Sequence, residues 1–187
     1  MLEKLEVVDE LFESWREPLG EAWGPYRGHV YRMLNFSLEL LSTEGESLKS
    51  YGEGEEWIDI LGIAAAFHDV GIWLDDTWDY LAPSRVHAAD YLKEQGKEDW
   101  TEAVELIIEW HHKQTRYRGP HEILVENFRR GDLIDVSLGV IRFGIPRATT
   151  KEIQKAFANL GFHMMLVKGL GVYGLKHPWK PLPMFRA

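Results

Sequence analysis

The sequence contains no cysteine, which excludes disulfides, thiolate metal sites and a cysteine nucleophile. It contains no run of about eighteen apolar residues, which predicts that no segment spans a membrane. Residues 1–6 carry mixed charges and lack the basic start and apolar core of a signal peptide. These absences favour a cytoplasmic protein.

Positive charge is also scarce, because 21 lysines and arginines face 30 aspartates and glutamates, for a formal net charge of −9. This balance argues against bulk binding to a nucleic-acid backbone, which requires a basic face. It does not exclude a small anionic substrate, because a bound metal ion and a few arginines can create a local positive site.

The periodicity of apolar residues is helical along nearly the whole chain. A length of 187 residues with 45% hydrophobic residues predicts one domain, residues 1–187, with a substantial core. The fold class is therefore predicted to be all-α, a single helical bundle without strands. Ser84 is a plausible N-cap for the helix expected over 85–95. Helices are expected over 2–16, 26–43, 55–68, 85–95, from about 99 or 101 to His111, and over 121–136 and 149–160. Loops are expected over 42–54, 70–83 and 113–120, and the tail is expected to be extended.

The pair His68-Asp69 is the most informative feature of the sequence. It lies in the small-residue run 63–71, near the end of a predicted helix. An imidazole and a carboxylate at adjacent positions can ligate one divalent metal ion or bridge two. His68 also continues the apolar stripe that contains Leu61 and Ala65, so its side chain is predicted to point inward.

Other helices carry inward-facing polar residues as well. His111 continues an apolar stripe, Asp132 follows Phe128 at i+4, and His29 lies near the start of its helix. A buried carboxylate is costly unless it meets a cation or hydrogen-bond donors. Asp135, one turn after Asp132, could take part in the site in place of Asp132.

Each of these residues also has an ordinary structural interpretation. A single histidine on an apolar helix face is usually a hydrogen-bonded core residue, and Asp132 could cap a helix or pair with Arg129 or Arg130. Four inward groups on four helices are instead typical of a metal site in a helical bundle. Nitrogen and oxygen ligands suit Mn, Fe, Co, Ni or Zn. The remaining histidines are expected to be structural or surface residues: His121, His163 and His177.

The order of these residues resembles the HD-domain superfamily of metal-dependent phosphohydrolases. The match consists of His29, the pair His68-Asp69 and Asp132, and the segment 129–135 is similar to the last motif of that family. The resemblance covers about residues 25–140. It implies a helical bundle of the HD-domain type in which these four residues hold one metal ion.

The resemblance also bears on the number of metal ions. In the binuclear branches of the family, two further histidines bind a second ion, and the aspartate of the pair bridges both. In this sequence those histidines would be His87 and His111, or His112 in place of His111. We therefore expect one or two ions, with Asp69 as the bridge in the second case.

The reaction expected from the resemblance is hydrolysis of a small phosphate ester by a metal-activated water. Arg32 is expected to bind the phosphate, and Lys113 is expected to hold it or to protonate the leaving group. Asp69 contributes to catalysis through the metal. The stretch after the pair lacks the glutamate that some nucleotidase branches use, and Asp75 or Asp76 could substitute. The groups that could further assist a phosphate or stack on a nucleobase are Arg116, Arg118, Trp73, Trp78 and Tyr80.

Two other functions remain open at this point. A di-iron oxygenase of similar fold would need all six ligands, including His87. A non-catalytic regulatory domain is the third interpretation, and the complete ligand set argues against it. The expected partner is a small phosphorylated substrate, neither nucleic acid in bulk nor a membrane, and assembly into a homo-oligomer is left open.

Overall fold

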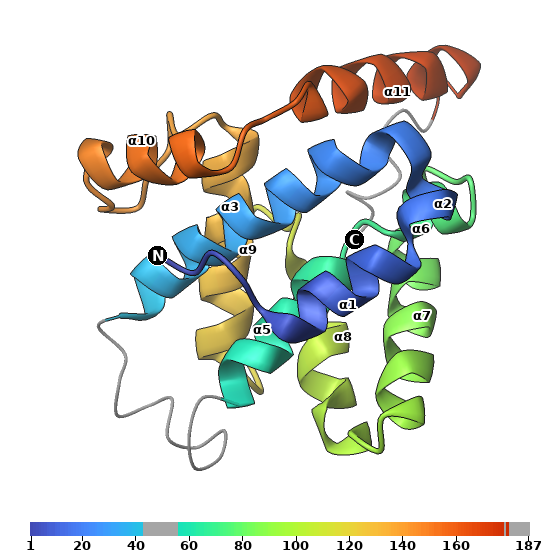
Figure 1. The fold of residues 1–187 in the computed structure, drawn as a ribbon, viewed down its shortest axis with the longest axis horizontal. Helices are drawn as coiled ribbons and strands as arrows, with labels where there is room; N and C mark the ends of the chain where they lie inside the picture. The colour runs from blue at the N-terminus through green and yellow to red at the C-terminus, as the bar shows by residue number, and fades with distance from the viewer. Residues whose placement is uncertain (43–55, 178, 180–187) are drawn as a thin grey trace.

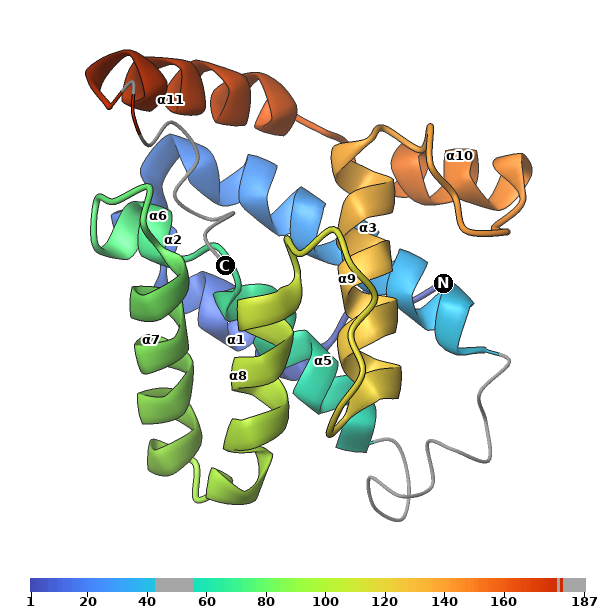
Figure 2. The same cartoon turned by 180° about the vertical axis from the view of Figure 1, so that it is seen from behind.

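The computed structural model describes residues 1–42, 56–177 and 179, and this part of the chain is a single all-α domain without strands. The expected loop over 42–54 and the tail lie almost entirely outside the described residues. Figures 1 and 2 show the arrangement of the helices from two sides. In chain order the α-helices are α1 (Glu6–Ser14), α2 (Arg16–Leu19), α3 (Trp23–Leu41), α5 (Glu56–Phe67), α6 (Gly71–Leu74), α7 (Leu81–Glu94), α8 (Thr101–Trp110), α9 (Glu122–Val136), α10 (Arg147–Ala156) and α11 (Phe162–Lys176). Two short 3-10 helices, η1 (Gly20–Ala22) and η3 (Glu98–Trp100), precede α3 and α8.

Helix α5 lies at the centre of the domain. It packs against α1, α3, α7, α8 and α9, and every residue from Ile60 to Phe67 is buried. A helix that is apolar on all sides is stable in water only when other helices surround it, which explains the small-residue run at this place in the sequence. The stretch Glu56–Leu74 is long and apolar enough to cross a membrane by length and composition, but 72% of it is buried inside the fold.

Helices α3 and α9 form the most extensive helix pair and cross closely at Gly131. A Cβ atom at Gly131 would lie 2.8 Å from the carbonyl oxygen of Met33 and closer still to the hydroxyl of Ser37. Only glycine permits this approach. Because His29 lies on α3 and Asp132 follows Gly131 on α9, the close crossing brings these two side chains together.

The structure corrects three details of the sequence prediction. Helix α3 begins at Trp23, before Pro25, because proline is tolerated in the first turn of a helix, where its missing N–H has no intrahelical partner. Ser84 is not an N-cap: it is buried within α7, and its hydroxyl accepts a hydrogen bond from the backbone N–H of Gly71. Helix α11 was not expected, because the sequence predicts a helix over 149–160 and no further helix after it.

Candidate metal centre

Four parts of the fold bring histidines and aspartates to one buried place. His29 comes from α3, the pair His68-Asp69 directly follows α5, and Asp132 comes from α9. His111 and His112 directly follow α8. We call these six residues the His/Asp cluster. All are buried except His112, which is partly exposed.

Hydrogen bonds set the orientation of three of the imidazoles. Nδ1 of His68 lies 2.7 Å from the carbonyl oxygen of Ala65, and Nδ1 of His111 lies 2.6 Å from that of Ile108. A carbonyl can only accept, so both Nδ1 atoms carry the proton. Nδ1 of His29 lies 2.7 Å from Oδ2 of Asp135, which accepts in the same way. Each ring therefore presents the lone pair of Nε2.

The Nε2 lone pairs of His29 and His68 face each other. Nε2 of His29 lies 3.1 Å from Nε2 of His68, and in this tautomer neither atom has a proton to donate. Within the described structure, Nε2 of His111 and Oδ1 of Asp69 are buried without a hydrogen-bond partner. Buried acceptors without a donor are costly, and a cation satisfies them together. The residues present therefore fit a metal ion.

Each carboxylate extends between two histidines. In Asp69, Oδ2 lies 3.3 Å from Nε2 of His68, and Oδ1 lies 3.4 Å from Nε2 of His111. In Asp132, Oδ1 lies 3.4 Å from Nε2 of His29, and Oδ2 lies 3.9 Å from Nδ1 of His112.

The cluster contains three overlapping groups whose ligand atoms lie within 4.8 Å of one another. They are His29–His68–Asp132, His68–Asp69–His111 and His111–His112–Asp132. These buried groups could hold a metal ion. Because neighbouring groups share a histidine or a carboxylate, the cluster extends beyond a single set of three ligands.

Burial favours the neutral form of two histidines of the cluster, His29 and His112. It lowers the pKa of His29 to about 4 and, together with the nearby His111, lowers the pKa of His112 well below its usual range. Burial alone would raise the pKa of Asp69, but His68 and His111 hold it well below the ordinary value. Neutral imidazole and ionised carboxylate are the forms that bind a metal.

The pKa of Asp132 is raised, unlike that of Asp69, and this difference leads to a prediction for the metal-free protein. Burial and the negative charges of Asp69 and Asp135 raise its pKa from 3.8 to about 7. The native carboxyl then keeps a proton that the unfolded chain loses, so the free energy of unfolding falls as pH rises from about 4 to about 7. We expect metal-free Asp132→Asn to be more stable than the wild type at pH 8, by up to about 4 kcal/mol. Near pH 4 the two proteins should be equally stable.

Urea denaturation of both proteins at several pH values, in the presence of a chelator, measures this difference. The same comparison with added divalent metal is the control, and there the wild type should be the more stable protein. A difference that does not change with pH would show that Asp132 does not titrate in this range.

The structure places Arg32 behind the cluster. Its guanidinium group donates to Oδ1 and Oδ2 of Asp135 at 2.6 and 2.9 Å, and its Nη1 donates to the carbonyl oxygens of Phe157 and Ala158. Arg32 is 2% exposed, so its donors are used internally. We assign it a positioning role through Asp135 and His29, in place of the phosphate contact expected from the sequence.

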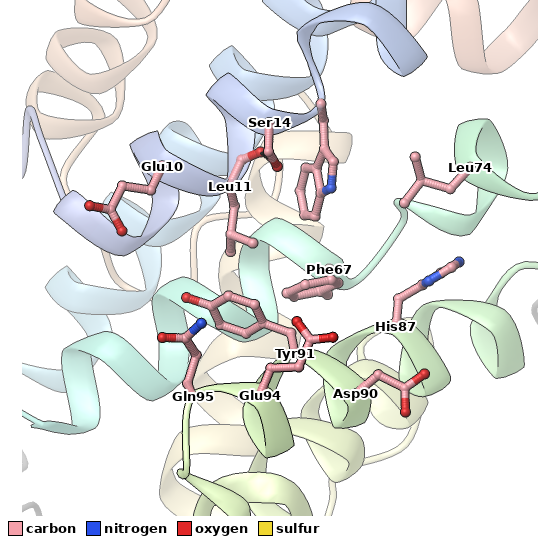
Figure 3. A pocket seen from close by; sticks show the side chains of 11 residues that line it. Glu10, Leu11, Ser14, Phe67, Leu74, His87, Asp90, Tyr91, Glu94 and Gln95 are labelled. Carbon is pink, nitrogen blue, oxygen red and sulfur yellow. Dashed lines mark hydrogen bonds between the residues drawn. The ribbon is translucent and has the colours of Figure 1, made fainter.

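His87 is not part of the cluster. Its Nε2 lies 2.8 Å from Oδ2 of Asp75, at the edge of a separate cavity of about 410 Å³ (Figure 3). His87 lies outside the cluster because the next residue on α7, Ala88, faces the core, and the side chain of His87 therefore points away from the core. His112, which the sequence offers as the alternative to His111, lies in the cluster together with His111.

A second cavity, of about 370 Å³, opens directly beside the cluster, and we call it the cluster pocket. It is lined by His111, His112, Lys113, Gln114, Arg129, Asp132, Leu133, Val136 and Ile141. Lys113, which the sequence predicts to hold the phosphate or to protonate the leaving group, is one of these lining residues. Arg129 is held by Glu126 and by the backbone carbonyl of Lys113, and the loop cation Arg116 pairs with Glu122.

None of the aromatic residues expected to stack on a base lines the cluster pocket. Trp73 packs against Tyr26 with ring centroids 4.5 Å apart, and Trp78 lies against Gly169 of α11. The hydroxyl of Tyr80 lies 2.5 Å from Nε2 of His112. Tyr80 therefore supports a residue of the cluster.

Several supporting residues were missed in the sequence. The hydroxyl of Tyr26 donates to the carbonyl oxygen of Ala66 and accepts from the backbone N–H of Asp69, which fixes the turn after α5. Tyr26 precedes His29 by one helical turn, and this spacing could have indicated it. Phe162 stacks on His29 with ring centroids 4.2 Å apart. Since α11 was not expected, no sequence signal pointed to Phe162.

The three remaining histidines lie outside the cluster and contact other residues. His163 donates from Nε2 to the carbonyl oxygen of Asp135 at 2.8 Å. His121 directly precedes α9 and pairs with Glu102 at 3.5 Å. His177 follows the end of α11 and packs on Tyr173.

Comparisons with known proteins found no matching family model, no similar curated protein and no similar solved structure. The assignment of function therefore depends on the geometry of the cluster. The chain is an all-helical domain with a buried group of histidines and aspartates that could hold a metal ion.

Proposed function

We propose that the protein is a metal-dependent phosphohydrolase of the HD-domain type that acts on a small phosphate ester. The observation that carries the proposal is the convergence of buried lone pairs from His29, His68 and His111 on the carboxylates of Asp69 and Asp132. The order of these residues along the chain is the order on which the family resemblance depends.

The chain offers ligands for two ions. His29, His68 and Asp132 would hold one ion, and His111, His112 and the second oxygens of Asp69 and Asp132 would hold the other. Bound ions supply a water of lowered pKa and polarise a phosphoryl oxygen. Divalent Mn, Fe, Co, Ni and Zn all suit this ligand set.

The other residues of the site have distinct tasks in this proposal. Asp135 and the backbone carbonyls of Ala65 and Ile108 hold the three histidines in the ligating tautomer. Lys113, in the cluster pocket, supplies positive charge for the phosphate and a proton for the leaving oxygen.

Electrostatics favours the cluster pocket over the cavity beside His87 as the place for a phosphate ester. The cavity beside His87 is lined by the carboxylates of Glu10, Asp90 and Glu94, which repel an anion (Figure 3). The cluster pocket instead contains Lys113 and Arg129 beside the metal ligands.

The test is removal and return of the metal. Protein stripped with a chelator should release no phosphate from a panel of phosphate monoesters, and added divalent metal should restore release. Metal content and oxygen consumption are measured on the same samples. Two irons with oxygen consumption and no phosphate release would favour the oxygenase alternative. Undiminished release by fully stripped protein would exclude metal-dependent hydrolysis.

A further inference from the structure

The residues that line the cluster pocket fall into two chemical groups. The polar group includes His111, His112 and Asp132 of the cluster and Lys113 beside them. The aliphatic group consists of Leu133 and Val136 of α9 and Ile141 of the loop that follows, and we call these three residues the aliphatic side. A substrate that fills this pocket therefore meets metal ligands and positive charge as well as hydrocarbon.

The aliphatic side is accessible to a ligand. Val136 is 40% exposed and Ile141 is 42% exposed, although both are large apolar side chains. Exposed apolar surface that adjoins a polar pocket is typical of a ligand-binding site. Burial of this surface by a substrate would contribute binding free energy in proportion to the apolar area covered.

The lining also argues against a nucleotide. A nucleobase and a ribose require stacking surfaces and several hydrogen-bond partners. Among the described residues that line the cluster pocket there is no tryptophan, tyrosine or phenylalanine, and Gln114 is the one side-chain amide.

We propose that the cluster pocket selects phosphate monoesters of apolar alcohols. The phosphate lies against the cluster and Lys113, and the hydrocarbon lies along Leu133, Val136 and Ile141. In the reaction, the oxygen of water forms a bond to phosphorus, the bond between phosphorus and the alcohol oxygen breaks, and a proton passes to that oxygen. The products are the free alcohol and inorganic phosphate. This assignment of substrate class rests on the proposed hydrolase function.

The test uses metal-loaded full-length protein and n-alkyl phosphates from ethyl to octyl, with adenosine monophosphate for comparison. We expect kcat/KM to rise about twofold to fourfold for each methylene that is buried, mainly through KM, until the pocket is full. Adenosine monophosphate should be a poorer substrate than hexyl phosphate. A kcat/KM independent of chain length, or a preference for the nucleotide, would overturn the assignment.

A matched pair of variants connects the preference to the pocket. Val136→Thr changes an exposed valine of the aliphatic side, and Val86→Thr makes the same change at an exposed valine of α7 outside this lining. Val136→Thr should reduce the increase in kcat/KM for each added methylene, whereas Val86→Thr should keep the wild-type increase. Equal behaviour of the two variants would contradict the location that we propose.

Binding of n-alkylphosphonates, which cannot be hydrolysed at the P–C bond, separates the two proposals. If no ester releases phosphate but phosphonate affinity still rises with chain length and depends on Val136, the hydrolase function fails and the binding preference stands. If phosphonate affinity does not depend on chain length, the preference itself fails.

Discussion

Replacement of His68 by alanine should abolish both the metal binding and the hydrolytic activity that we propose. His68 belongs to two of the three ligand groups, and its Nε2 lies 3.1 Å from Nε2 of His29 and 3.3 Å from Oδ2 of Asp69. Loss of the ion removes several kcal/mol of transition-state stabilisation, so we expect phosphate release to fall on the order of 1000-fold or more. Metal content per chain, measured by plasma mass spectrometry beside the kinetics, should fall with it.

His87→Ala is the matched control for this prediction. His87 lies outside the cluster and pairs with Asp75, so its loss should leave metal content and activity close to the wild-type values. Circular dichroism checks that both variants remain helical. If His68→Ala folds and retains its metal, the cluster is not the metal centre. If His87→Ala loses metal to the same degree, His87 ligates in the loaded protein, as the family resemblance implied.

Replacement of Asp135 by asparagine should have the second-largest effect, on both metal affinity and stability. Asp135 accepts hydrogen bonds from Nδ1 of His29 and from the guanidinium group of Arg32. Burial alone would raise the pKa of Asp135, but these partners hold it below the ordinary value, so the carboxylate is ionised. Asparagine leaves the buried charge of Arg32 without a counterion, which costs about 3–5 kcal/mol of unfolding free energy. It also replaces the carboxylate that accepts from Nδ1 of His29 with a neutral amide, which orients the ring less firmly, so metal affinity should fall about 10- to 100-fold.

A second substitution separates these two roles of Asp135. Asp135→Asn combined with Arg32→Met removes the unpaired charge, so the double variant should recover stability toward the wild type. Its metal affinity should remain as low as that of the single variant, because the acceptor for His29 is still changed. Urea denaturation and competitive metal titration give the two quantities. Recovery of metal affinity together with stability would mean that Asp135 acts only by maintaining the fold.

Much of the fold could be predicted because its helices have strong local signals. The stretch that forms α5 is apolar on all sides, and the turn residues between the other helices separate them clearly. Helix α11 lacks such signals. It contains Gly169, Gly171 and Gly174, which disfavour a helix, and it has no clear apolar stripe. Its contacts depend on residues distant in sequence, such as Trp78 against Gly169, and single-sequence periodicity does not show these.

The candidate site could be predicted where helix periodicity determines the direction of a side chain. This is so for His68, His111 and Asp132, which the structure places in the cluster. The sequence indicates His29 only through the family resemblance. His112 follows His111 beyond the last turn of α8, and both residues lie in the cluster.

The role of Arg32 could not be inferred from local pattern. Its partner Asp135 lies 103 positions away, and nothing near Arg32 in the sequence indicates that pairing. A free arginine beside a predicted metal ligand was therefore interpreted as a phosphate-binding group, whereas the fold uses its charge to anchor a carboxylate.

A chain without cysteine lacks the usual covalent means of tying distant segments together, and the His/Asp cluster provides a substitute. An ion held by His29, His68 and Asp132 would close a loop of about 100 residues between α3 and α9, and it would also join the end of α5 to them. Closing a loop of that length with a permanent bond restricts the unfolded chain by roughly 4–5 kcal/mol. A coordinated ion supplies a comparable restraint that can be withdrawn. The metal supply in the surroundings would then set how long the folded chain survives as well as how fast it works.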